Sequence, residues 1–164
     1  MTEQASKYKD EGKMLQLIYL AEANLKYCLQ LRSFIERKKA QYSAKESAEF
    51  INEKVQYWTL VSNNHFLAAV LIVDNLLRRP NKYMGALSFQ YYLQQNYLEE
   101  ERKKMLGEER ESLWRKYKGY GLNAIRDQIA GHQDKDNIGD AFYFTYKLTN
   151  DEHINNLGEI MVGL

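Results

Sequence analysis

Residues 66–77 read FLAAVLIVDNLL, and this stretch decides the fold class. Only Asp74 and Asn75 interrupt an otherwise apolar run. A helix that is apolar on all sides lies in the middle of a helical bundle. Upstream, apolar residues continue at helical spacing through Trp58, and Ser43 with Glu46 forms a capping box. We therefore expect a central helix that starts at Ala44, with Trp58 and Leu71 buried in the bundle.

The central helix should end at the Arg78-Arg79-Pro80 sequence, where a basic last turn is followed by the only proline of the chain. Before it, residues 7–39 have one apolar stripe at helical spacing and predict a long amphipathic helix. The stripe consists of Leu17, Leu20, Ala21, Asn24, Leu25, Cys28, Leu31 and Ile35.

Three further helical stretches follow. The first runs from Met84 to about Leu106, where Glu99 with Lys103 and Glu100 with Lys104 form i,i+4 pairs. The second runs from Glu108 to Ala130, and Gly119 and Gly121 predict a bend, a break or close packing within it. The third follows the capping box of Thr149 and Glu152, with Ile154, Leu157 and Leu164 on one face.

Residues 131–148 have an irregular pattern, in which Phe142 to Tyr146 predict a short strand or an extended segment. The sequence therefore predicts an all-α bundle of about five helices, as a single domain over residues 1–164. No C-cap follows the last apolar face, so the native chain is expected to be able to continue beyond Leu164.

The composition is that of a soluble globular protein, with 45% hydrophobic and 27% charged residues. Cys28 is the only cysteine, which excludes an intrachain disulfide and a zinc site built of several thiolates in one chain. Residues 1–10 lack the apolar stretch of a secretory signal, and the longest apolar run, residues 66–73, is shorter than the roughly 20 residues that span a bilayer. We expect a cytoplasmic protein without a membrane partner.

The net charge is +1, but the charges are unevenly distributed. Residues 26–45 contain six Lys or Arg against one Glu, and residues 127–159 contain seven acids against two Lys. Two interpretations stay open. The segments can be solvated faces that attract each other, or the basic segment can meet phosphates.

Of the three histidines, His65 is expected in the core and His153 at the surface. His132 closes the string Arg126-Asp127-Gln128-Ile129-Ala130-Gly131-His132. RNA cleavage without a metal needs a proton-transfer group and a cation that neutralises the phosphorane, and His132 and Arg126 are of those two types.

A separation of six residues places two side chains about 120° apart on a straight helix, so Arg126 and His132 would not meet there. Gly131 can end the helix and turn His132 back, or the motif can be completed by a second copy across a dimer axis. A structural interpretation is also open. Arg126 can pair with Asp127 or with acids of residues 134–140, and His132 can cap a helix C-terminus.

The string resembles the Arg-polar-x(3–5)-His motif of the HEPN superfamily, a group of all-helical nucleotide-binding proteins. It is most similar to the HEPN-like domain of the abortive-infection U family. There an Arg-Asp or Arg-Asn pair is followed by a small residue, His and Asp, which corresponds to Arg126-Asp127 and to Gly131, His132 and Asp134 here. Residues 58–61 and 86–89 also resemble that family, and the likeness covers roughly residues 45–140. Gly131 and Gln133 depart from its pattern.

The resemblance implies a HEPN-like bundle that forms a homodimer, with Arg126, Asp127 and His132 as catalytic residues of a metal-independent endoribonuclease. Arg126 would stabilise the transition-state phosphate, His132 would act as acid or base, and Asp127 would orient one of them. The implied partners are an RNA substrate and an antitoxin or other defence-system protein in phage defence. Some members only bind, so a non-catalytic module for nucleotides or proteins is the alternative.

We expect no cofactor and no metal. The sequence contains no phosphate-binding loop of the Gly-x(4)-Gly-Lys-Ser/Thr type and no Gly-x-Gly-x-x-Gly. The acids from Asp134 onward do not complete a calcium loop, because Ile138 and Thr145 stand at ligand positions.

Overall fold

The structure is a computed structural model that describes residues 3–41, 54–78, 88–95, 97–131 and 149–164. In these residues it contains six α-helices and no strand. The helices are α1 (Glu3–Gln41), α3 (Gln56–Leu77), α4 (Phe89–Leu93), α5 (Glu100–Gly119), α6 (Leu122–Gly131) and α8 (Asp151–Val162). The predicted all-α class is confirmed.

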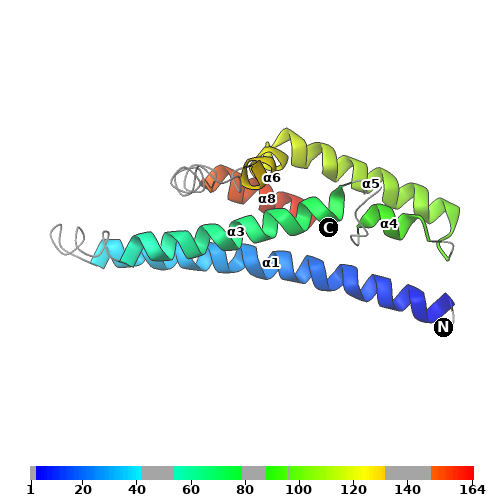
Figure 1. Ribbon diagram of the computed structural model, residues 1–164, viewed down its shortest axis with the longest axis horizontal. Helices are drawn as coiled ribbons and strands as arrows, with labels where there is room; N and C mark the ends of the chain where they lie inside the picture. Colours follow the sequence, from blue (N-terminus) through cyan, green and yellow to red (C-terminus); the bar gives the residue numbers. More distant parts are fainter. Residues whose placement is uncertain (1–2, 42–53, 79–87, 96, 132–148) are drawn as a thin grey trace.

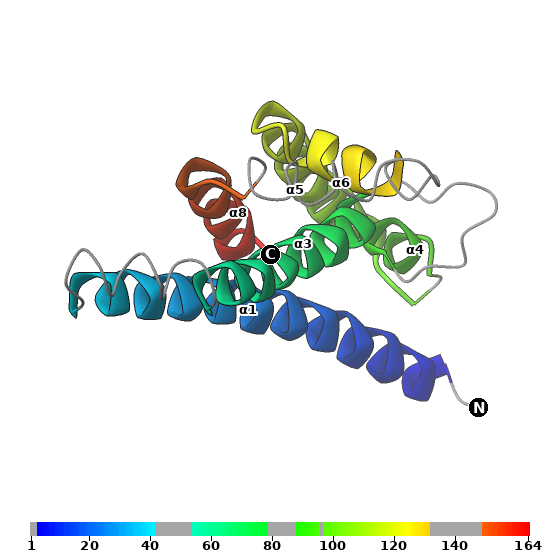
Figure 2. The same ribbon diagram turned by 60° about the vertical axis from the view of Figure 1, so that its left-hand side comes forward.

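The helices α1 and α3 form an antiparallel pair, which Figures 1 and 2 both show side by side. The Ser62 hydroxyl donates to the Cys28 carbonyl at 3.0 Å, and one turn further along, His65 Nδ1 lies 2.8 Å from Asn24 Oδ1. On the other side of α3 lie α5 and α6, with α8 beside them, so α3 is the middle element. This is the central position that the apolar run of residues 66–77 predicts.

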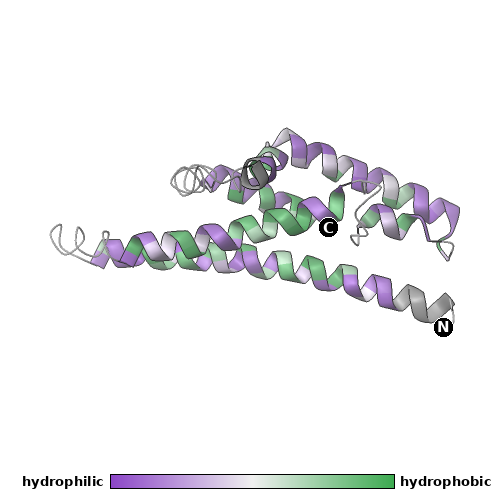
Figure 3. Cartoon of the chain, viewed as in Figure 1, coloured by the Kyte–Doolittle hydropathy of each residue, from purple (hydrophilic) through white to green (hydrophobic). Residues whose placement is uncertain are grey.

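Two groups of buried apolar residues hold the helices together. The larger group, here the central cluster, joins α1, α3, α5, α6 and α8, and its members include Leu25, Cys28, Phe66, Val70, Val73, Leu77, Tyr117, Leu122, Ile125, Leu157 and Ile160. The smaller group, here the end cluster, consists of Met14 of α1, Tyr92 of α4 and Leu98. Figure 3 shows that the C-terminal half of α3 is predominantly hydrophobic, whereas α5 is largely hydrophilic.

Three burial predictions were wrong. Leu71 is 37% exposed, because it shares the outward face of α3 with the exposed Asn64 and Asn75. Trp58 is half-buried against Phe34, at a ring-centroid distance of 6.1 Å. In α1, Leu20 is 51% exposed although the predicted stripe includes it.

The helix predicted from Met84 to Leu106 is also wrong. Within residues 88–95, α4 ends at Leu93, and α5 begins only at Glu100. Leu98 is buried in the end cluster, so the chain turns inward there instead of continuing α4. The predicted pair of Glu99 with Lys103 is not formed, because Glu99 precedes the helix, and Lys103 pairs instead with Glu100 at 2.7 Å.

The break predicted at Gly119 and Gly121 is confirmed. Helix α5 ends at Gly119 and α6 begins at Leu122. Between them Gly121 has φ +72°, a left-handed conformation that glycine adopts without the strain of a Cβ atom. The last predicted helix is α8, but its N-cap is Asn150, whose side chain accepts from the His153 amide at 2.7 Å, and not Thr149.

Other predicted features lie outside the described residues. These are the capping box of Ser43 and Glu46 and the segment from Asp134 to Tyr146. The end of the central helix was predicted correctly, since α3 stops at Leu77 and Arg78 is extended. By length and composition α3 is the one described helix apolar enough to cross a bilayer, but half of the window that qualifies is buried by the other helices. A single helix of this kind is weak evidence for a membrane span, because core helices of folded bundles pass the same test of length and composition.

Candidate functional site

Helix α6 positions the predicted pair of Arg126 and Asp127. Leu122 and Ile125 are 0% and 1% exposed and pack in the central cluster, which fixes α6 against α3. The next residue, Arg126, lies at the edge of this contact, and its side chain is 22% exposed. Its Nη2 atom is 2.5 Å from Asp127 Oδ1, and its Nε atom is 3.8 Å from Oδ2 of Asp74 in α3.

Asp74 is the buried member of this group, with a side chain only 2% exposed. Arg78, the C-cap residue that follows α3, approaches it with Nη2 at 3.0 Å from Oδ2. Burial raises the pKa of the Asp74 carboxyl above its ordinary value, although the charge of Arg78 opposes this shift. The carboxyl of Asp74 therefore connects α3 to α6 through Arg126, and it also pairs with Arg78 at the end of its own helix.

The four charged groups Asp74, Arg78, Arg126 and Asp127 carry two positive and two negative formal charges. Among the described residues, Arg126 Nε is buried and has no hydrogen-bond partner, only the longer ion pair with Asp74. Asp127 is 58% exposed at its side chain. The guanidinium of Arg126 is thus held in one place by two carboxylates, with part of its surface open to solvent.

His132, the third predicted catalytic residue, lies outside the described residues. Helix α6 is described up to Gly131, the residue that precedes it. The structure therefore brings together Arg126 and Asp127 of the predicted site, and adds Asp74 and Arg78, which sequence reasoning did not select. The available signal was Asp74 itself, since a carboxylate inside an apolar helix is almost never fully buried without a partner.

The basic segment of residues 26–45 is partly neutralised within the chain. Arg32 donates to Asp151 and to the carbonyl of Thr149, and Lys39 pairs with Glu36 at 2.8 Å. Asp151 belongs to the acidic segment, so at this point the two oppositely charged segments do contact each other. Beside them is a cavity of about 380 Å³ between α1, α3 and the start of α8.

The histidines outside the motif have structural environments. His65 is half-buried, bonded to Asn24, and lies against Tyr27 with ring centroids 5.5 Å apart. His153 lies in the first turn of α8, as predicted, and is half-buried there. Within the described ranges, no group of three His, Cys, Asp or Glu side chains could hold a metal ion.

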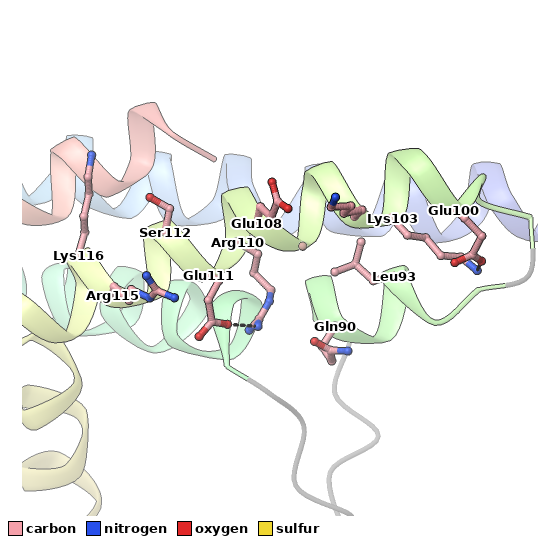
Figure 4. Close-up of a pocket in the computed structure, with 12 residues that line it drawn as sticks. Gln90, Leu93, Glu100, Lys103, Glu108, Arg110, Glu111, Ser112, Arg115 and Lys116 are labelled. Carbon is pink, nitrogen blue, oxygen red and sulfur yellow. Dashed lines mark hydrogen bonds and ion pairs between the residues drawn. The ribbon is translucent and has the colours of Figure 1, made fainter.

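A second concave surface lies along α5 and faces α4, as a groove of about 830 Å³ (Figure 4). It is lined by five basic residues, Lys103, Lys104, Arg110, Arg115 and Lys116, and by three acids, Glu100, Glu108 and Glu111. Arg110 is 4% exposed and donates to the Leu77 carbonyl at the end of α3 at 2.8 Å. Figure 4 also shows its ion pair with Glu111, at 2.5 Å.

The basic residues that line this groove differ in whether they have a structural role. Arg110 is committed to the fold, because it satisfies a carbonyl at the C-terminus of α3. Arg115 and Lys116 are exposed at the C-terminal end of the groove and form no ion pair with the described residues. That end can attract anions such as phosphates, but it lacks the buried donors of a specific nucleotide site.

Comparisons of the chain with protein-family models, curated proteins and solved structures find no match.

Proposed function

We propose that this chain is a HEPN-like, metal-independent endoribonuclease, or a defence or toxin protein derived from one, that acts in the cytoplasm as a homodimer. The observation that carries the proposal is the fixed guanidinium of Arg126, held between Asp74 and Asp127 and 22% exposed. An arginine that is already positioned loses little entropy when it binds two phosphate oxygens with its planar fork.

The chemistry of the proposal divides among three residues. Arg126 neutralises the phosphorane formed when a 2′-hydroxyl attacks the neighbouring phosphate. His132 takes the proton of that hydroxyl or gives a proton to the leaving oxygen. Asp127 orients Arg126 through their 2.5 Å ion pair. No metal enters this scheme, and the exposed cations Arg115 and Lys116 can add sequence-independent attraction for RNA.

The second candidate is a non-catalytic helical module that binds a nucleotide or a partner protein, such as an antitoxin. One observation favours it. Asp74 and Asp127 already offset the positive charge of Arg126, and Asp74 is buried, so Arg126 also fits a purely structural role. Removing one member of a buried ion pair commonly destabilises a protein by about 3–5 kcal/mol.

RNA cleavage by purified variants separates the two candidates. For the ribonuclease, His132→Ala lowers cleavage by about 10²–10⁴ without loss of stability, and Arg126→Lys also inactivates. Asp127→Asn is milder, since the motif that this string resembles accepts either residue, and a chelator has no effect. The matched control is Arg102→Lys, because this exposed arginine lies outside the motif and does not line the groove along α5.

The opposite pattern supports the binding module. There the wild-type chain cleaves no RNA, and the Arg126 variant lowers the melting temperature. Cleavage that stops when a chelator is added contradicts the proposed mechanism, whichever variants are active.

A further inference from the structure

The outer face of α1 carries large apolar side chains that no described helix covers. Leu15, Tyr19 and Leu29 are 52%, 65% and 48% exposed. The opposite face of the same helix packs on α3 through buried residues such as Leu25 and Cys28. Helix α1 is therefore apolar on two sides, and the described helices cover only one of them.

The exposed residues follow a coiled-coil spacing. Steps of four and three residues connect Leu15, Tyr19, Glu22, Lys26, Leu29 and Ser33, and every one of them is exposed. We call this row the outer seam. A repeat of this kind keeps one narrow stripe of a helix in line with a partner helix over several turns.

The charges in the outer seam select the partner. We propose that a second copy of this chain packs on it, with the two α1 helices antiparallel around a two-fold axis beside Asn24. In this register Glu22 of each copy faces Lys26 of the other, so two ion pairs form at the centre. Tyr19 faces Leu29 of the second copy on both sides of them, and Leu15 faces Ser33.

A parallel pair does not fit the same residues. It would place Glu22 opposite Glu22 and Lys26 opposite Lys26, and like charges across an interface are costly. Polar side chains at such core positions typically specify orientation and register rather than affinity. Beside the outer seam, the antiparallel register places Ala23 of one chain next to Ala23 of the second chain. The small alanine side chains permit the two helices to approach closely.

The pairing does not depend on RNA cleavage. Helices α1 and α6 lie on opposite sides of α3 (Figures 1 and 2), so contact through the outer seam leaves Arg126 and Asp127 facing away from the interface. The outer seam thus gives the proposed homodimer a surface, and in such a dimer each motif would be completed within its own chain.

Charge reversal tests the pairing, with sedimentation of the full chain as the readout. Glu22→Lys places two lysines opposite each other, and Lys26→Glu places two glutamates opposite each other, so each variant alone weakens dimerisation at least about tenfold. The double variant restores both ion pairs and recovers the dimer. Tyr19→Glu disrupts it, whereas Leu20→Glu, at a neighbouring exposed residue outside the seam, does not.

Disulfide formation tests the orientation. A mixture of Tyr19→Cys and Leu29→Cys chains forms a covalent dimer on oxidation, whereas neither variant does so alone. Cys28 is 0% exposed and does not interfere. The proposal is overturned if the wild type is monomeric at high micromolar concentration, or if the dimer tolerates Glu22→Lys and Tyr19→Glu. A disulfide between two Tyr19→Cys chains would indicate a parallel pair and would also overturn the proposal. These tests of dimerisation are independent of the RNA-cleavage assay, so the two proposals can fail separately.

Discussion

The central cluster and the end cluster are built on the same helix by different means. The central cluster joins five helices, and its buried members are mainly aliphatic. The end cluster has three buried residues and relies on tyrosine hydroxyls, with Tyr92 donating to Glu11 at 2.5 Å and Tyr97 to Asp10 at 3.5 Å. The difference indicates that burial of apolar surface holds the middle of α1 in the bundle, whereas polar bonds near the N-terminus of α1 fix the position of the short helix α4.

The largest expected effect comes from a truncation in the central cluster. Phe66→Ala should lower the free energy of unfolding by about 3–5 kcal/mol, because Phe66 is 0% exposed and its removal leaves a cavity. Leu98→Ala in the end cluster should lower it by only about 2 kcal/mol, because leucine is smaller than phenylalanine and its cluster has only three buried residues. Urea unfolding followed by circular dichroism measures both. Equal losses would contradict the distinction between the two clusters.

The next effect concerns the connection between α5 and α6. Gly121→Ala should lower stability by about 1–2 kcal/mol, because φ at +72° is unfavourable for a residue with a Cβ atom, even though no atom lies within 4 Å of the added group. Gly119→Ala is the matched control, since it has the same open surroundings without the positive φ. That variant should be neutral or stabilising by up to about 1 kcal/mol in thermal unfolding. Similar losses in both variants would exclude the conformational explanation.

The polar bonds of the end cluster give a smaller effect. Tyr92→Phe should lower stability by about 1 kcal/mol, because the hydroxyl that bonds to Glu11 is lost while the ring remains. Tyr91→Phe changes an exposed neighbour in the same helix and should have almost no effect. Thermal melting compares the two, and a larger loss for the Tyr91 variant would show that the bond to Glu11 does not stabilise α4.

The pH dependence of stability at Asp74 has the smallest expected effect. The pKa of Asp74 is raised by burial, so the folded chain binds this proton more tightly than the unfolded chain. Its favourable contribution is present below the ordinary pKa of 3.8 and is lost as the pH rises through the raised value. Asp74→Asn should therefore gain stability relative to the wild type as the pH rises above 3.8. Thermal melting of both proteins across this pH range measures the effect. A difference in melting temperature that does not change with pH would contradict the role of the Asp74 carboxyl.

The sequence predicted the central architecture because burial there follows from apolar pattern alone. The run from Phe66 to Leu77, the stop after it and the break near Gly121 each depend on a few neighbouring residues. The division between α4 and α5 was missed, because it depends on Leu98 packing against Met14, far away in the sequence. Local helix propensity carries no information about such a contact.

The candidate site was predictable only in part for the same reason. The adjacent pair of Arg126 and Asp127 is visible in the sequence, and their ion pair is formed. Asp74 could be recognised as an unusual carboxylate in an apolar helix, but its partner Arg126 lies on another helix. Pairing across helices depends on the crossing of α3 and α6, which no local pattern encodes.

The length of α1 has a consequence for local unfolding. Its backbone passes from Met14 in the end cluster to Leu25 and Cys28 in the central cluster without interruption. Backbone amides exchange with solvent deuterium by the least costly opening that exposes them. Amides near Met14 can open when α4 detaches, whereas those near Cys28 need the whole bundle to unfold. A single continuous helix thus contains two levels of protection against hydrogen exchange.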